Sequence, residues 1–156
     1  MIEIHKKSIF SNTYIATENR RPLAEFSRSL WRQKAELNYA NEQFTLTRSG
    51  VLTSTFQLLK NDQLMMEISQ PSSLKSRLEF HYQDKEYTIT SLAWHSTSYV
   101  ISHKDKEVGR ITARGWFKSG AKVVNSDNFS VPIKLFLAWV AMVRWDDNNN
   151  AAGAGS

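Results

Sequence analysis

Cysteine is absent from this chain of 156 residues. Its absence excludes disulfide bonds, a thiol nucleophile, an iron–sulfur cluster and every zinc site built on thiolates. Glycine and proline are scarce, with six and three residues, and no glycine lies in a Gly-x-Gly-x-x-Gly or phosphate-loop pattern. The sequence therefore offers no disulfide framework, and it predicts neither a nucleotide site nor a cofactor.

Long runs of like charge are also missing. The chain has 20 Lys and Arg residues against 15 Asp and Glu, a net charge of +5, which favours anionic partners such as lipid headgroups or nucleic acid. These charges stand singly or in pairs, such as Lys6-Lys7 and Arg20-Arg21, with no block of the kind that marks a nucleic-acid tail. A solvated protein surface is the simpler explanation of this charge.

The N-terminal residues Met1 to Lys7 alternate between apolar and polar side chains. They lack the continuous apolar run of a secretory signal and are better described as a strand. Together with the absence of cysteine, this pattern predicts a cytoplasmic protein, with a location peripheral to a membrane as the alternative.

Apolar side chains recur at every second position from the start of the chain to about Val124, which is the period of a β-strand. The clearest examples are Phe44 and Leu46; Phe56 and Leu58; Leu64, Met66 and Ile68; Leu78, Phe80 and Tyr82; Tyr87 and Ile89; and Val108 to Ile111. Each such strand should present one face to water and the other to the core. The 18 aromatic residues argue further against intrinsic disorder.

Turn-forming residues separate these strands. Besides Arg48 to Gly50, the pairs Asn61-Asp62, Asp84-Lys85 and Asp105-Lys106 recur at intervals of roughly twenty residues. This spacing suits successive hairpins and predicts an antiparallel meander instead of alternating strands and helices. The segment from Arg28 to Glu36 fits either a short helix or a strand.

A different pattern begins near the C-terminus. Ser130 and Pro132 are typical of a helix start, and all nine residues of Leu135–Val143 are apolar. A helix that is apolar all round must be enclosed by protein or lipid. A bilayer span needs about 20 apolar residues, and this run lies between Lys134 and Arg144, so it is too short. An interfacial helix needs a polar face, which is missing. The sequence predicts a core helix.

One domain is expected over residues 1–147, because this length suits a single hydrophobic core. Its terminal helix should span about residues 131–145. Residues 148–156 are small and polar, and they should form a disordered tail or be partly left over from cloning.

The order of these patterns resembles the tubby C-terminal-like superfamily, in particular the LURP-one-related proteins and their small bacterial relatives. The resemblance rests on Met65–Ser69 with Leu74–Phe80, on the hairpin Ser102–Ile111 and on the ending Pro132–Val140. Together these segments span about residues 44–145. The similarity is one of pattern and order, with no invariant motif.

The resemblance implies a mainly β fold: a closed antiparallel barrel of about twelve strands that encloses the C-terminal hydrophobic helix. Tubby proteins bind phosphoinositides, and phospholipid scramblases, which also belong to the superfamily, are proposed to act on lipids with calcium. No residue of these activities carries over to a position of this sequence, and no acidic cluster has calcium-loop spacing. The implied link is to lipid surfaces in general.

A basic and aromatic segment is the candidate ligand site. Alternation on a strand places the basic side chains on one face, with an aromatic side chain near them. The residues are Arg110, Arg114, Trp116, Lys118 and Lys122. The bases could attract an anionic lipid headgroup, with tryptophan as an interfacial anchor. Single-stranded nucleic acid is the alternative ligand, with the aromatic ring stacked on a base. The simpler interpretation is a solvated exterior with the aromatic side chains turned inward.

No pattern of a catalytic or metal site is present. The four histidines lack metal-ligand spacing, no Gly-x-Ser-x-Gly elbow occurs, and Glu79, Glu86 and Glu107 show no pairing suited to acid–base catalysis. The sequence therefore predicts a noncatalytic binding or scaffold module, which could associate with an anionic lipid or membrane surface. A nucleic-acid-binding protein and a lipid-processing enzyme remain as alternatives.

Overall fold

A computed structural model shows twelve β-strands followed by one α-helix. It describes residues 1–8, 11–30, 33–50, 53–72, 76–91, 97–114, 120–124 and 129–154, with only the main chain for Ser29, Leu30 and residues 149–154. The elements are β1 Ile2–Lys6, β2 Thr13–Glu18, β3 Arg21–Leu30, β4 Lys34–Tyr39, β5 Glu42–Ser49, β6 Thr55–Lys60, β7 Gln63–Ser69, β8 Leu78–Tyr82, β9 Lys85–Ser91, β10 Ser98–His103, β11 Lys106–Arg114, β12 Gly120–Val124 and α1 Val131–Ala154.

The strands form a closed antiparallel barrel, so the predicted fold class is confirmed. Each strand pairs with its neighbours in chain order, and β1 pairs with β12 to close the ring, with Ile2 opposite Val123 and Ile4 opposite Ala121. Closure matters because an open sheet would leave two strands with unpaired main-chain groups. The segment from Arg28 to Glu36, which the sequence leaves open, contributes to β3 and β4 and contains no described helix.

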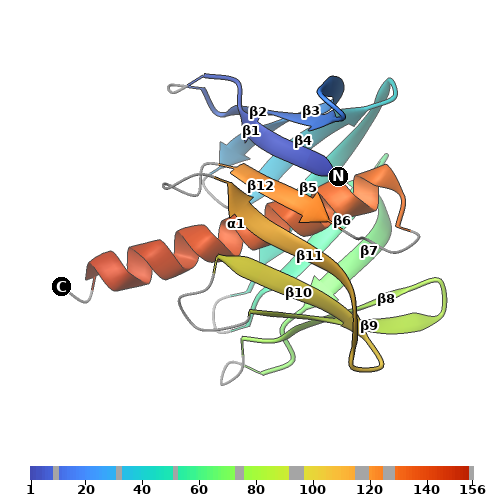
Figure 1. The fold of residues 1–156 in the computed structure, drawn as a ribbon, viewed down its shortest axis with the longest axis vertical. Helices are drawn as coiled ribbons and strands as arrows, with labels where there is room; N and C mark the ends of the chain where they lie inside the picture. The colour runs from blue at the N-terminus through green and yellow to red at the C-terminus, as the bar shows by residue number, and fades with distance from the viewer. Residues whose placement is uncertain are drawn as a thin grey trace.

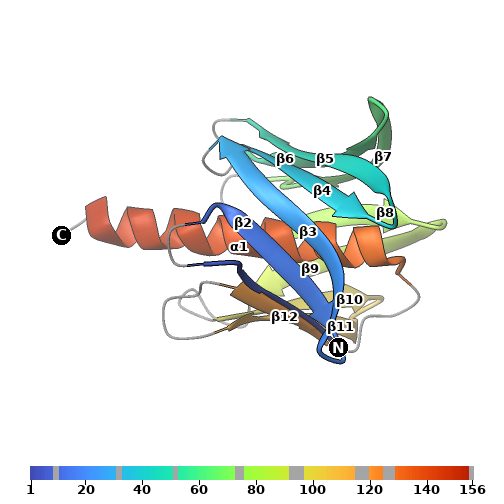
Figure 2. The same cartoon turned by 90° about the horizontal axis from the view of Figure 1, so that it is seen from above.

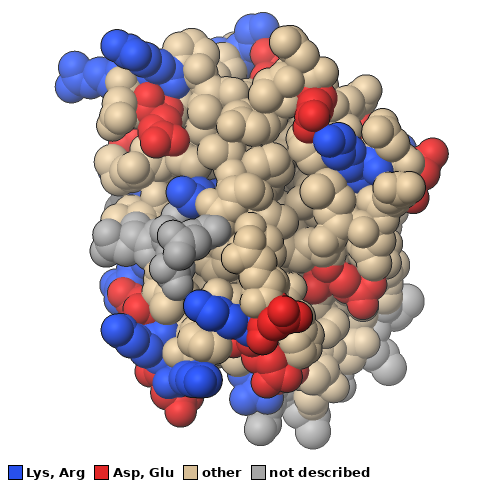
Figure 3. Space-filling view, turned by 90° about the vertical axis from the view of Figure 1, so that its right-hand side faces the viewer, with Lys and Arg blue, Asp and Glu red and all other residues tan. Residues whose placement is uncertain are grey.

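Five tight hairpin turns lie at one end of the barrel, around the start of α1. In each turn both central residues have positive φ, between 50° and 66°. Such values are typical of two-residue turns whose twist matches that of the flanking strands. The pairs are Asn19-Arg20, Ala40-Asn41, Asn61-Asp62, Gln83-Asp84 and Lys104-Asp105. Figure 3 views this end, where acidic and basic side chains are interspersed around the rim and much of the centre is uncharged.

An internal repeat of about 42 residues underlies the barrel. The hairpins β2–β3, β6–β7 and β10–β11 each carry one extra residue on the second strand, at the third position after the turn: Leu23, Met65 and Val108. A main-chain hydrogen bond recurs with the same spacing, from Arg28 N–H to Asn12 O, Gln70 N–H to Ser54 O and Ala113 N–H to Thr97 O. The barrel is thus built from three related groups of four strands.

One of these bulges corrects a prediction about β7. Simple alternation predicts that Leu64 faces inward with Met66 and Ile68. Because Met65 is the extra residue of the bulge, the alternation shifts by one position. Leu64 and Met65 are 54% and 51% exposed, whereas Met66 and Ile68 are buried.

The helix α1 runs through the centre of the barrel (Figures 1 and 2). It begins where the sequence predicts, and the N–H of Lys134 donates to the carbonyl oxygen of Ser130. Every side chain of Leu135–Val143 is at most 3% exposed. The predicted core helix is therefore confirmed.

The end of α1 differs from the prediction. The helix continues to Ala154 instead of ending near residue 145, so residues 148–154 are helical where a disordered tail is expected from their composition. Residues 155–156 lie outside the described part of the chain. At about 1.5 Å per residue, 24 residues span about 36 Å, and the C-terminal turns project beyond the strands (Figures 1 and 2).

Candidate functional site

The described bases of the predicted site lie on the outside of β11 and β12. Arg110 and Arg114 are four residues apart on β11, so they share its outer face, and Lys122 on β12 lies opposite Thr112 of β11. Their burial is intermediate, in keeping with an outer surface. Trp116 and Lys118 lie outside the described residues.

Carboxylates from neighbouring positions partly neutralise this basic face. Arg110 forms an ion pair with Glu107 over 2.6 Å, and Arg114 lies 3.9 Å from a carboxylate oxygen of Glu3. Glu3 is also the cross-strand neighbour of Lys122. Three cations therefore share their surroundings with two carboxylates, which leaves a net formal charge of +1 for the described part of the face. Its attraction for an anion is weak, because exposed ion pairs and solvent screen it.

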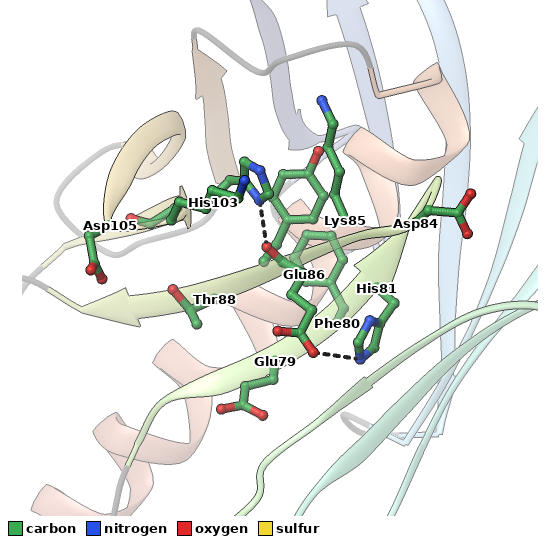
Figure 4. Close-up of a pocket in the computed structure, with 12 residues that line it drawn as sticks. Glu79, Phe80, His81, Asp84, Lys85, Glu86, Thr88, His103 and Asp105 are labelled. Carbon is green, nitrogen blue, oxygen red and sulfur yellow. Dashed lines mark hydrogen bonds and ion pairs between the residues drawn. The ribbon is translucent and has the colours of Figure 1, made fainter.

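A second candidate surface, which the sequence analysis missed, is a hollow of about 400 Å³ between the hairpins β8–β9 and β10–β11 (Figure 4). It is lined by Glu79, Phe80, His81, Asp84, Lys85, Glu86, Tyr87, Thr88, Ser102, His103, Lys104 and Asp105. Four carboxylates and two lysines contribute to this lining. The surface is therefore acidic, although the protein as a whole carries +5.

Glu86 joins two histidines in this hollow. The Nδ1 atom of His103 lies 2.8 Å from the main-chain oxygen of Glu86. Because a carbonyl oxygen can only accept, Nδ1 is the donor and carries the proton. On the other side, the carboxylate of Glu86 lies 3.6 Å from Nε2 of His81, and both side chains are largely exposed. Figure 4 shows these two contacts reaching Glu86 from opposite directions.

An aromatic cluster supports the hollow from inside the barrel. Tyr87 stacks on Phe80 with ring centroids 5.0 Å apart, contacts the ring of His103 at 5.3 Å and meets Phe129 edge-on at 5.1 Å. Phe129 precedes α1, so these contacts connect the hairpin to the start of the core helix. Aromatic pairs of this kind are worth about 0.5–1.5 kcal/mol each beyond their buried area, so they stabilise the base of the hollow.

A third feature is an arginine collar where α1 leaves the barrel. Arg28 of β3 binds Asp146 over 2.8 Å, and Arg48 of β5 binds Asp147 over 2.7 Å and also donates to the hydroxyl of Ser54. The burial of Arg28 by itself would lower the pKa of its guanidinium. The hydrogen bond to Asp146, together with further stabilising contacts, outweighs this effect, so the pKa of Arg28 is raised. The collar fixes the helix at one depth in the barrel.

Arg144 extends the collar on another side of the helix. It donates to the side-chain oxygen of Gln70 and to the main-chain oxygen of Ser76. Burial raises the pKa of the Tyr99 hydroxyl, and the nearby positive charge of Arg144 acts in the opposite direction. These polar contacts hold α1 in position in the barrel, and they join residues that lie far apart in the sequence.

Within the described residues, no three or more His, Asp or Glu side chains come close enough together to hold a metal ion. In the same part of the chain, no helix combines the length and the apolar character that a membrane crossing requires. Comparisons with protein-family models, curated proteins and solved structures found no match.

Proposed function

We propose that this protein is a noncatalytic binding or scaffold module that engages its partner on the outer surface of the barrel. The observation that carries the proposal is the buried segment Leu135–Val143, which fills the lumen with the protein's own side chains. In a small barrel whose interior is occupied in this way, a ligand must bind at the wall or the rim. The hollow between the hairpins β8–β9 and β10–β11 lies on that outer surface.

The tubby-like relationship remains part of this proposal. A closed barrel of twelve strands around a C-terminal helix is the architecture that the resemblance implies. Fold alone does not fix an activity, so the surface has to supply the argument for a partner.

An anionic membrane surface is the partner that the basic face suits. Arg110, Arg114 and Lys122 lie on neighbouring strands with their charged groups outside the core. Since Glu3 and Glu107 offset much of this charge, the binding should be weak and should require low ionic strength.

Cosedimentation with vesicles tests this version. At low salt, the protein should sediment with vesicles that contain phosphatidylserine and stay in solution with pure phosphatidylcholine. Replacing Arg110, Arg114 and Lys122 with glutamine should reduce the bound fraction severalfold, because each basic residue contributes at most about 1 kcal/mol and Glu3 and Glu107 offset part of this attraction. The matched control replaces Lys60, Lys85 and Lys104 with glutamine, which removes three positive charges from outside the basic face. Equal losses in both variants, or no binding at low salt, would remove the lipid version.

A further inference from the structure

The pairing between β7 and β8 is unusually short. Only two residue pairs join these strands, Ile68 with Phe80 and Ser69 with Glu79. On its other side β7 pairs with β6 along nearly its whole length, and β8 pairs with β9 throughout. Part of each strand edge therefore faces an open seam in a barrel that is otherwise closed by longer ladders.

The internal repeat shows which pairs are missing. The seam between β3 and β4 corresponds to this one, since Phe26 opposite Leu37 is the counterpart of Ile68 opposite Phe80. In the β3–β4 seam the ladder continues toward the turns through Glu25 opposite Asn38 and Ala24 opposite Tyr39. The corresponding pairs in the β7–β8 seam would be Glu67 with His81 and Met66 with Tyr82. Neither pair forms.

The missing pair of Glu67 and His81 is one that would carry hydrogen bonds. The main-chain N–H of Gln70 donates to the carbonyl oxygen of Ser54 on the β6 side. Because main-chain groups alternate in direction along a strand, those of Glu67 are directed toward β8. Tyr82 and Lys85 flank the two-residue turn, and their main-chain groups face each other. The main-chain N–H and C=O groups of the next residue, His81, are therefore directed toward β7. Both edges thus present main-chain donors and acceptors to the seam.

The seam also holds a hollow and two exposed apolar side chains. The hollow has a volume of about 370 Å³ and is lined by Leu64, Met65, Met66, Glu67, Ser69, Glu79, Phe80 and His81. The bulge at Met65 is what turns Leu64 and Met65 outward. An open strand edge beside apolar side chains is the arrangement by which proteins accept an additional strand.

We propose that the edge of β7 at residues 63–67 binds an extended segment of a partner protein in which apolar and basic side chains alternate. Its main chain would bond to Glu67, its apolar side chains would cover Leu64 and Met65, and its basic side chains would lie beside carboxylates. This inference rests on the proposed binding at the outer surface, but it uses a different face from the basic one.

Charge selects the occupant of the seam. Glu67 receives an amide hydrogen bond from Gln57 and forms no ion pair among the described residues, so its negative charge is available. On the adjoining hairpin, Asp84 and Glu86 outweigh Lys85 and add a net negative charge. A second copy of β7 would bring one Glu67 close to another, and an anionic membrane would meet these same carboxylates. Both are disfavoured by like-charge repulsion, whereas a basic segment is attracted.

Amide hydrogen exchange by NMR tests whether the seam is open. In the free protein, the amides of Glu67 and His81 should exchange at least tenfold faster than those of Glu25 and Asn38, their counterparts in the paired seam. This comparison is internal to one folded molecule, so no variant is required. Protection of Glu67 and His81 equal to that of their counterparts would overturn the proposal.

Peptide binding tests the occupant. A short fluorescein-labelled peptide in which Lys and Val alternate should bind with an increase in anisotropy and should slow the exchange of the Glu67 amide. A control peptide with Glu in place of each Lys should not bind. The variant Glu67→Lys should weaken binding about tenfold, whereas Glu25→Lys, the same change at the exposed counterpart, should leave it unchanged.

Three further outcomes would contradict the proposal. Equal binding of the two peptides, equal effects of Glu67→Lys and Glu25→Lys, or protection of Glu67 by self-association in the absence of peptide would overturn it. The Glu67→Lys variant should still bind vesicles, whereas replacing the basic residues of β11 and β12 should reduce vesicle binding severalfold. This outcome would show that the lipid and peptide proposals concern separate surfaces. Failure of the vesicle assay alone would affect only the lipid version.

Discussion

Replacing Trp139 with alanine is expected to lower the free energy of unfolding by about 3–5 kcal/mol. Trp139 lies in the middle of the enclosed segment Leu135–Val143, is 0% exposed and meets the ring of Phe56 edge-on at 5.9 Å. Removing its ring leaves a cavity that strands held in a closed ladder cannot collapse to fill. Since typical domains are stable by about 5–15 kcal/mol, this one change should remove a large fraction of the total. Thermal and urea unfolding measure it.

The variant Trp139→Phe is the matched control. It keeps an aromatic ring in the core and removes an indole N–H that has no hydrogen-bond partner among the described residues. Its loss of stability should therefore be much smaller than that of the alanine variant. Leu64→Ala, at an exposed position, should change stability by no more than about 0.5 kcal/mol. A Trp139→Ala protein as stable as Leu64→Ala would contradict the enclosed helix.

The change Gly120→Ala is expected to destabilise the barrel by about 2–3 kcal/mol. Gly120 begins β12, the strand that closes the ring by pairing with β1. A Cβ atom at this position would overlap the main-chain oxygen of Ile4. That oxygen belongs to a strand paired on both sides, so relief of the overlap requires the closing seam to separate.

Lys122→Ala provides the control for Gly120→Ala, because it introduces the same residue two positions along the same strand. Lys122 lies on the outside of the ladder, and its replacement should change the stability by no more than about 0.5 kcal/mol. Equal unfolding midpoints for the two variants would show that the β1–β12 closure does not need the space left by glycine.

The sequence predicts the barrel and its helix well because both depend on burial. Alternating pairs such as Phe44 and Leu46, or Phe56 and Leu58, are all buried, since a strand with one wet face has only one way to place its apolar side chains. The nine apolar residues Leu135–Val143 likewise admit only an enclosed position once their length excludes a span.

Predictions that depend on a single extra residue or on weak local preference failed. Nothing in the alternation of Leu64, Met66 and Ile68 signals that Met65 is an added residue, although the repeat relates it to Leu23 and Val108. Residues 148–154 have the composition of a tail, yet they continue a helix whose preceding turns are already formed, and extending an existing helix needs no new nucleation.

The candidate binding surfaces were the least predictable part of the molecule. Sequence spacing identified Arg110 and Arg114 as neighbours on one face, but it could not show that Glu3, more than a hundred residues away, lies beside Arg114. The hollow around Glu86 likewise needs two separate hairpins. The open seam is visible only when the ladder of β7 and β8 is compared with that of β3 and β4.

Hydrogen exchange along α1 tests most directly whether the barrel is filled by its own helix, on which the proposal of binding at the outer surface depends. The amides of Leu135–Val143 should exchange only through global unfolding, as slowly as the slowest strand amides, because nothing short of opening the barrel exposes them to water. Exchange of these amides at the rates of a solvated helix, while the strands stay protected, would show that the helix leaves a folded barrel and would contradict the account.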